Sequence, residues 1–147
     1  MNGFEFRETM AGSYHLLERP GDERPMSFTI RARSGGFFRF LRRPEVEIEG
    51  EIDAQGLADH RYLRGTLGLD LVRTGELPYA FRFTGNDGAS YVFEGKKTVS
   101  AREFTESMTV LPGAIKDARG VEIARALLRF DLRSDLAKFL RSFRLSR

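Results

Sequence analysis

The chain has 147 residues, of which 41% are hydrophobic and 31% are charged, a composition typical of a single globular domain spanning 1–147. It contains 13 Phe and no Cys, which excludes a disulfide framework, a zinc–thiolate site and a cysteine nucleophile. The formal net charge is +3, and residues 119–147 hold eight basic and three acidic side chains. This imbalance is too mild for a dedicated duplex-binding protein, so we expect no nucleic-acid partner.

The first residues lack the basic segment followed by an apolar segment that marks a signal peptide. No run approaches 18 apolar residues, so no transmembrane segment is expected. The absence of cysteine agrees with a reducing compartment, and the cytoplasm is the expected location.

Apolar and polar residues alternate with a period of two through most of the chain, which predicts half-buried β-strands. In chain order, strands are expected within 4–17, 26–33, 45–53, 67–71, 77–84, around 91–93, within 104–111 and within 125–132. Asn, Asp and Gly at 84–88 would supply the positive φ angles of a tight turn, and 53–56 and 117–120 are similar. Short connections favour antiparallel neighbours, so the expected fold class is all-β.

The last expected element is an amphipathic helix over 134–144. Ser134 can cap it, and Leu136, Phe139, Leu140 and Phe143 fall on one stripe. A helix of about 11 residues is marginal alone, so we expect it to dock on the sheet, with a membrane surface or a partner as the alternative. Eight antiparallel strands with one helix favour a closed or nearly closed, lipocalin-like β-barrel over a sandwich, because closure removes sheet edges.

The segment 45–51 has a Glu at every second position, so its carboxylates share one face of a strand about 6.5–7 Å apart. A glycosidase acid–base pair or a calcium site would be the functional alternatives. The pattern is more typical of a solvated face that pairs with Arg31 and Arg33 on the preceding strand.

No catalytic residue, metal ligand or cofactor can be assigned from the sequence. His15 and His60 are isolated from other ligand-type residues, and His60 is expected at the surface. The chain lacks a nucleophile elbow, a dinucleotide-binding glycine motif and a phosphate loop. A small barrel enzyme that uses the polar groups of Thr66, Lys97 or Glu106 inside the barrel stays as a minor alternative.

The segment 34–44 joins four bulky apolar residues to three Arg between two well-patterned strands. It either packs inward to close the barrel, or forms a flap over an apolar cavity or an exposed patch for lipid or protein. Phe37, Phe38, Phe40 and Arg39 are therefore candidate ligand-binding residues.

Aromatic residues at expected inward positions predict an apolar lumen; these are Phe28, Tyr79, Phe81, Tyr91 and Phe93. The leading hypothesis is a non-catalytic barrel that binds an apolar small molecule, a fatty acid or a sterol-like lipid, in its interior. The second is an interaction module with a solid core and no ligand. A continuous cavity of about 300 Å³ or more would favour the first, and a packed interior the second.

Six stretches resemble an accessory module of large glucose-methanol-choline oxidoreductases of the cholesterol-oxidase-like group, some of which are fused to α/β-hydrolase domains. They are FRETMAG at 6–12, LRGTL at 63–67, YAFRFTGNDG at 79–88, YVFEGKK at 91–97, SMTVL at 107–111 and LRSFR at 140–144. The family provides no catalytic residue in this module, and the flavin-binding and hydrolase parts are absent. The resemblance implies an accessory domain that travels with lipid- or sterol-handling enzymes, with a flavin-dependent oxidoreductase or a hydrolase as partner.

Overall fold

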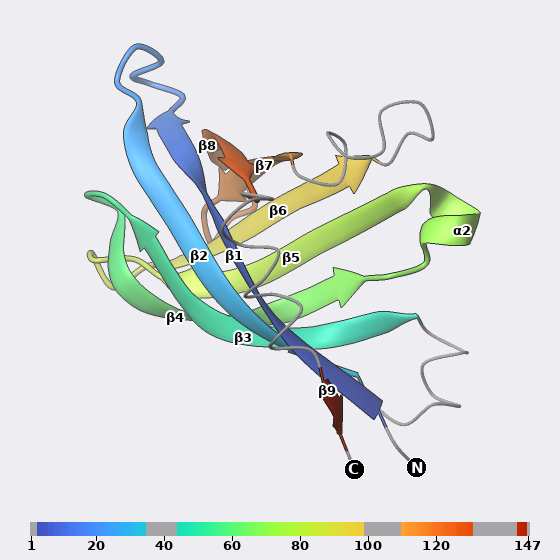
Figure 1. Ribbon diagram of the computed structural model, residues 1–147. Coiled ribbons are helices and arrows are strands. Elements are labelled where there is room, and N and C mark those ends of the chain that lie inside the picture. Colours follow the sequence, from blue (N-terminus) through green and yellow to red (C-terminus); the bar gives the residue numbers. More distant parts are fainter. Residues whose placement is uncertain (1–2, 35–43, 99–109, 131–143, 147) are drawn as a thin grey trace.

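The computed structural model describes residues 3–34, 44–98, 110–130 and 144–146, whose strands form one antiparallel β-sheet that closes into a barrel (Figure 1). The barrel strands are β1 (Gly3–Leu16), β2 (Arg24–Arg33), β3 (Glu45–Ala54), β4 (Ala58–Gly68), β5 (Glu76–Thr84), β6 (Ser90–Thr98), β7 (Val110–Lys116) and β8 (Glu122–Arg129). A short helix, α2 (Leu71–Thr74), connects β4 to β5, and a short strand, β9 (Arg144–Ser146), follows the barrel. The expected all-β antiparallel barrel is confirmed.

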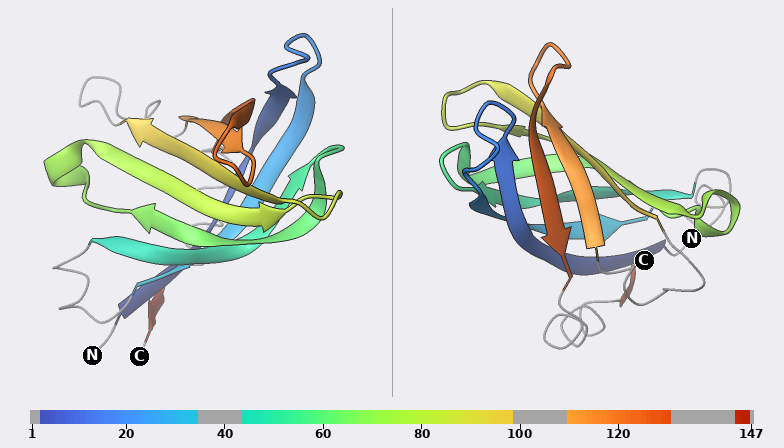
Figure 2. Two further views of the ribbon diagram at one scale, coloured as in Figure 1. Left: turned by 180° about the vertical axis from the view of Figure 1, so that it is seen from behind. Right: turned by 90° about the horizontal axis from the view of Figure 1, so that it is seen from above.

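The barrel closes because β1 pairs with strands on both of its sides. It pairs with β2 from Glu5 to Tyr14 and with β8 from Ala11 to Leu16. The start of β1 also pairs with β9, at residues 3–5. Every other barrel strand pairs with its neighbours in sequence order, and the two views of Figure 2 show β7 and β8 completing the ring between β6 and β1.

The strand alternation predicted from the sequence sorts the side chains between the two faces of the sheet. In β2 and β3, Ile30 and Ile48 are buried, whereas the Glu residues at 45–51 are exposed. In β8, Ala126 and Leu128 point inward and Leu127 points outward. One apolar core therefore fills the interior of the barrel.

Two glycines allow neighbouring strands to cross closely enough for the sheet to curve. A Cβ atom on Gly50 would lie 1.9 Å from the carbonyl oxygen of Thr29, and one on Gly65 would lie 1.9 Å from that of Ala80. Every other residue type would force these strands apart, so both bends require glycine.

The two ends of the barrel differ in their connections. Short connections join β1 to β2, β3 to β4, β5 to β6 and β7 to β8 at one end, which we call the hairpin end. Gly56, Gly88 and Gly120 adopt φ angles of 85°, 82° and 81° in three of these connections. At the opposite end of the barrel, which we call the loop end, β2, β4 and β6 end and β3, β5 and β7 begin (Figure 1).

In the turn at 84–88 the Asn and Asp residues act differently from the expectation. Only Gly88 has a positive φ there. Asn86 accepts a hydrogen bond from the backbone of Asp59, and Asp87 accepts one from the backbone of Ala89. Their side chains fix the turn, because short polar side chains compete well for free backbone N–H groups.

Several predicted boundaries differ from the structure. β4 begins at Ala58, nine residues before the expected start at 67, and β8 begins at Glu122, three residues before the expected start at 125. The strand expected over 67–71 is wrong beyond Gly68, because hydrogen bonds from Thr74 to the Asp70 carbonyl close the turn of α2. The strand expected within 104–111 continues to Lys116. Pro112 and Gly113 interrupt the alternation of apolar and polar residues, so the sequence did not predict this extension. Residues 104–109 lie outside the described ranges. Residues 134–143 of the expected helix also lie outside them, and Arg144, its expected last residue, begins β9.

Candidate functional site

Three polar side chains, Glu8, Tyr79 and Lys97, form a cluster inside the barrel near the loop end. Glu8 extends from β1, Tyr79 from β5 and Lys97 from β6. Their exposed fractions are 9%, 2% and 3%. Because β1 and β5 lie on opposite walls of the barrel, these side chains meet across the lumen.

The Glu8 carboxylate is the acceptor that the other two groups share. The Tyr79 hydroxyl donates to Glu8 Oε1 at 2.5 Å, and Lys97 Nζ donates to Oε2 at 3.0 Å. Lys97 Nζ also lies 5.3 Å from the ring centre of Tyr79 and 5.9 Å from that of Phe130. These rings add electrostatic attraction to the ammonium group.

The electrostatics of the cluster keep Tyr79 a hydrogen-bond donor. Burial, together with the Glu8 carboxylate beside it, raises the pKa of Tyr79 well above its usual value. Removing the Glu8 and Lys97 charges from water costs several kcal/mol per ion, which their attraction and the added hydrogen bonds must offset. An ion pair is thus maintained inside an apolar core.

Three of the aromatic residues predicted to line the lumen point inward and contact one another across it. Phe28 of β2 reaches Phe81 of β5 and Phe93 of β6, with ring centres 5.2 and 5.8 Å apart. Phe81 and Phe93 stack on each other at 4.9 Å. Rings from opposite walls are therefore in contact at this level of the barrel.

The other two predicted aromatic residues lie on either side of these rings. Tyr79 belongs to the polar cluster. Tyr91 lies toward the hairpin end, stacks on Phe83 at 5.7 Å and donates to Asp87 Oδ2 at 2.7 Å. This hydrogen bond raises the pKa of Tyr91 to about 12 and lowers that of Asp87. Tyr91 thus anchors a turn.

Two of the polar groups weighed for a barrel enzyme, Thr66 and Lys97, lie in the described residues, and of these two Lys97 is in the interior. Thr66 is exposed on the outer face of β4, which corrects the expectation for this residue. Glu106 lies outside the described residues, as do Phe37, Phe38, Arg39 and Phe40 of the expected flap.

Sequence reasoning missed Glu8, although a signal for it exists. Phe6, Met10 and Tyr14 alternate along β1 and are all buried. A carboxylate at position 8 therefore falls on the apolar face of a strand, which is a marker of a buried and paired charge.

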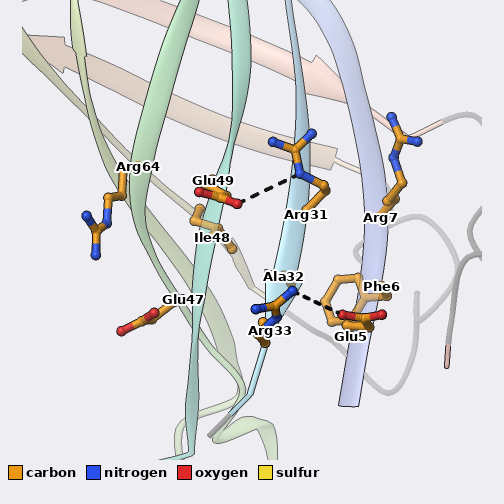
Figure 3. Close-up of a pocket in the computed structure, with 10 residues that line it drawn as sticks. All are labelled: Glu5, Phe6, Arg7, Arg31, Ala32, Arg33, Glu47, Ile48, Glu49 and Arg64. Carbon is orange, nitrogen blue, oxygen red and sulfur yellow. Dashed lines mark ion pairs between the residues drawn. The ribbon is translucent and has the colours of Figure 1, made fainter. Parts of the chain in front are cut away.

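A groove of about 500 Å³ lies on the outer face of β1 to β4, outside the lumen (Figure 3). Its charged lining comprises Glu5, Arg7, Arg31, Arg33, Glu47, Glu49 and Arg64. Arg31 Nε lies 4.0 Å from Glu49 Oε1, and Arg33 Nη2 lies 3.6 Å from Glu5 Oε2. The Glu residues at 45–51 thus form an exposed face. The expected ion pair with Arg31 is present, whereas Arg33 pairs with Glu5 of β1 instead of with this face.

The histidines form part of no metal centre among the described residues, where no group of three His, Asp or Glu side chains could hold an ion. His60 is 72% exposed, which confirms its surface position, and it lies near Glu51 and Asp53 on β3. Within the same ranges, no helix is long and apolar enough to cross a membrane.

Comparisons of this chain with protein-family models, with curated proteins and with solved structures give no match. The chemistry of the site therefore follows from its geometry. An ammonium group has three donors, and Glu8 uses one of those on Lys97. A carboxylate or carbonyl oxygen reaching the cluster could accept a further hydrogen bond, so the arrangement suits recognition of a polar head group.

Proposed function

We propose that this protein is a non-catalytic binding module that holds an apolar small molecule, such as a fatty acid or a sterol-like lipid, in the interior of its barrel. The observation that carries the proposal is the cluster of Glu8, Tyr79 and Lys97, buried among apolar side chains near the loop end. An amphipathic ligand has matching chemistry, with an apolar body for the core and a polar head for the cluster.

In this proposal the ligand enters at the loop end. Its head group accepts a hydrogen bond from Lys97, because Glu8 uses only one of the three ammonium donors, while the Tyr79 hydroxyl continues to donate to Glu8. The rings of Phe28, Phe81 and Phe93 limit how deep the ligand reaches. Phe37, Phe38, Phe40 and Arg39, which lie outside the described residues, stay the candidate ligand-binding residues of the segment 34–44.

Titration with a fluorescent fatty acid tests this proposal. The double variant Glu8→Gln/Lys97→Met removes the ion pair without leaving a buried unpaired charge, so we expect it to fold. It should bind the fatty acid at least about tenfold more weakly, which is a loss of about 1.4 kcal/mol or more of binding free energy. It should also lose the preference for the fatty acid over the matching alcohol.

The matched control is Glu76→Gln/Lys96→Met, which removes an exposed ion pair of 3.1 Å between β5 and β6. Its affinity should equal that of the unmodified protein. Equal binding by the Glu8→Gln/Lys97→Met variant, or no binding by the unmodified protein, would contradict the proposal.

A second candidate is an interaction module that binds no ligand of its own and docks on a flavin-dependent oxidoreductase or a hydrolase. The contact of Phe28 with Phe81 and Phe93 across the lumen supports it, because a filled lumen leaves less room for a ligand. Native mass spectrometry of the protein purified from its own cells separates the candidates. A bound small molecule supports the first, a bound enzyme supports the second, and neither mass would count against both.

A further inference from the structure

A row of charged residues crosses the outer face of the barrel, perpendicular to the strands. Arg7 of β1 lies opposite Arg31 of β2, and Arg31 lies opposite Glu49 of β3. Glu49 lies opposite Arg64 of β4, which lies opposite Arg82 of β5. We call these five residues the arginine row, and Figure 3 shows its first four members along the outer groove.

The arginine row contains two like-charge neighbours, Arg7 with Arg31 and Arg64 with Arg82. Like charges directly opposite each other in a sheet are destabilising. The single carboxylate of the row, Glu49, lies 4.0 Å from Arg31 and also accepts a hydrogen bond from Tyr62. Arg64 and Arg82 therefore retain repulsion that a bound anion would relieve.

Arg64 and Arg82 are the members most available to such an anion. Both side chains are exposed, and within the described chain neither has a carboxylate oxygen within 4.0 Å. The planar guanidinium group holds a carboxylate through two parallel hydrogen bonds, and two adjacent guanidinium groups could share one or two such carboxylates.

The groove also offers an acidic group, Glu47, that has no ion-pair partner in the part of the chain that the structure describes. Glu47 lies two positions from Glu49 on β3, and in the described ranges no basic nitrogen comes within 4.0 Å of it. A nucleic-acid backbone would be repelled there, because its charge is uniformly negative. A protein segment can instead place acids against the arginine row and a base against Glu47.

We propose that the outer face of β1 to β5 is a docking surface for an acidic segment of a partner protein. The segment's carboxylates pair with Arg64, Arg82 and Arg31, and a basic side chain beside them pairs with Glu47. This surface lies outside the barrel, so the proposal does not depend on a ligand in the interior.

Fluorescence anisotropy with a labelled synthetic peptide, rich in Glu and carrying one Lys, tests the proposal. We expect Arg64→Gln/Arg82→Gln to weaken binding by at least about tenfold, or about 1.4 kcal/mol. The control Arg125→Gln/Arg129→Gln removes the same charge from β8, which is outside the docking surface and across the barrel from β4, and should weaken binding less than about twofold. Without peptide, Arg64→Gln/Arg82→Gln should melt at the same or a higher temperature, since repulsion is removed.

A second peptide, with the Lys replaced by Ala, tests the contact with Glu47. It should bind the unmodified protein more weakly than the Lys peptide, and Glu47→Gln should abolish that difference. Equal weakening by Arg64→Gln/Arg82→Gln and by Arg125→Gln/Arg129→Gln would show that only the net charge of the protein attracts the peptide. That result would overturn the proposal. Tighter binding of single-stranded DNA of equal length, or no peptide binding at low salt, would overturn it as well.

Discussion

At the scale of single residues, Lys97 and Glu8 depend on each other for their burial. Replacing Lys97 with Met leaves the Glu8 carboxylate inside the core without its ammonium partner. We expect Lys97→Met to lower the free energy of unfolding by about 3–5 kcal/mol, because an uncompensated buried charge is costly. Urea unfolding followed by circular dichroism measures the change.

The double variant Glu8→Gln/Lys97→Met is the internal control for this experiment. It removes both charges and should recover most of the lost stability. If Lys97→Met alone cost less than about 1 kcal/mol, the pair would behave like a surface ion pair, and the cluster would be hydrated.

Phe28 is one of the residues through which opposite walls of the barrel touch. It contacts Phe81 and Phe93, and its side chain is fully buried. Phe28→Ala should cost about 3–5 kcal/mol of unfolding free energy, as for large-to-small changes in cores, and Phe28→Leu should cost clearly less. A loss under about 1 kcal/mol for Phe28→Ala would mean that the lumen is loosely packed.

At the scale of strands, closure of the sheet depends on bends that side chains would block. Gly50→Ala would place a Cβ against the Thr29 carbonyl oxygen, so β2 and β3 would have to separate. We expect a loss of at least about 2 kcal/mol, within the range for overpacked interiors, measurable as a lower urea midpoint.

The matched control for this prediction is Gly21→Ala, in the turn between β1 and β2. A Cβ atom there meets no atom within 4 Å, and Gly21 has no positive φ. Its stability should stay within about 0.5 kcal/mol of the unmodified protein. Equal effects of the two substitutions would show that loss of glycine flexibility, and not the strand crossing, is being measured.

The strands themselves could be predicted because alternation is a local property. Each of β2, β3 and β5 carries the pattern within about ten residues, and glycines mark the turns between neighbours. The same alternation, with Leu67 inward, already places Thr66 outside. The helix α2 was missed because it depends on hydrogen bonds within a single turn rather than on a pattern.

The site could be predicted only in part, because its contacts join distant parts of the chain. Lys97 was recognised as an inward polar group, but its partner Glu8 lies 89 residues away. Their meeting depends on strand order and register around the whole barrel. The residues of the arginine row likewise become neighbours only through pairing across five strands.

At the scale of the whole molecule, the protein has four Tyr, and the fold raises the pKa of each. Below about pH 10 the phenols are protonated in the folded and the unfolded states, so their contribution to stability is constant. Above that pH the unfolded phenols ionise first, so stability should fall until the folded pKa is reached, about 12 for Tyr91.

Tyrosinate absorbance during an alkaline titration checks this prediction. Ionisation should begin at a higher pH in the native protein than in urea, and Tyr79→Phe should make the alkaline loss of stability shallower. Identical titration curves in native and urea-unfolded protein would contradict it.

The pairing of β1 with β8 also constrains how the barrel is made during synthesis. The partners Tyr14 and Ala126 are about 110 residues apart, whereas every other barrel pairing joins consecutive strands. At about 5–20 residues per second, the ribosome needs roughly 6–20 s to deliver β8 after β1. During that interval one edge of β1 is open to pairing with another nascent chain. Biosynthesis, more than the finished fold, is therefore the stage at which this edge of β1 is exposed to aggregation.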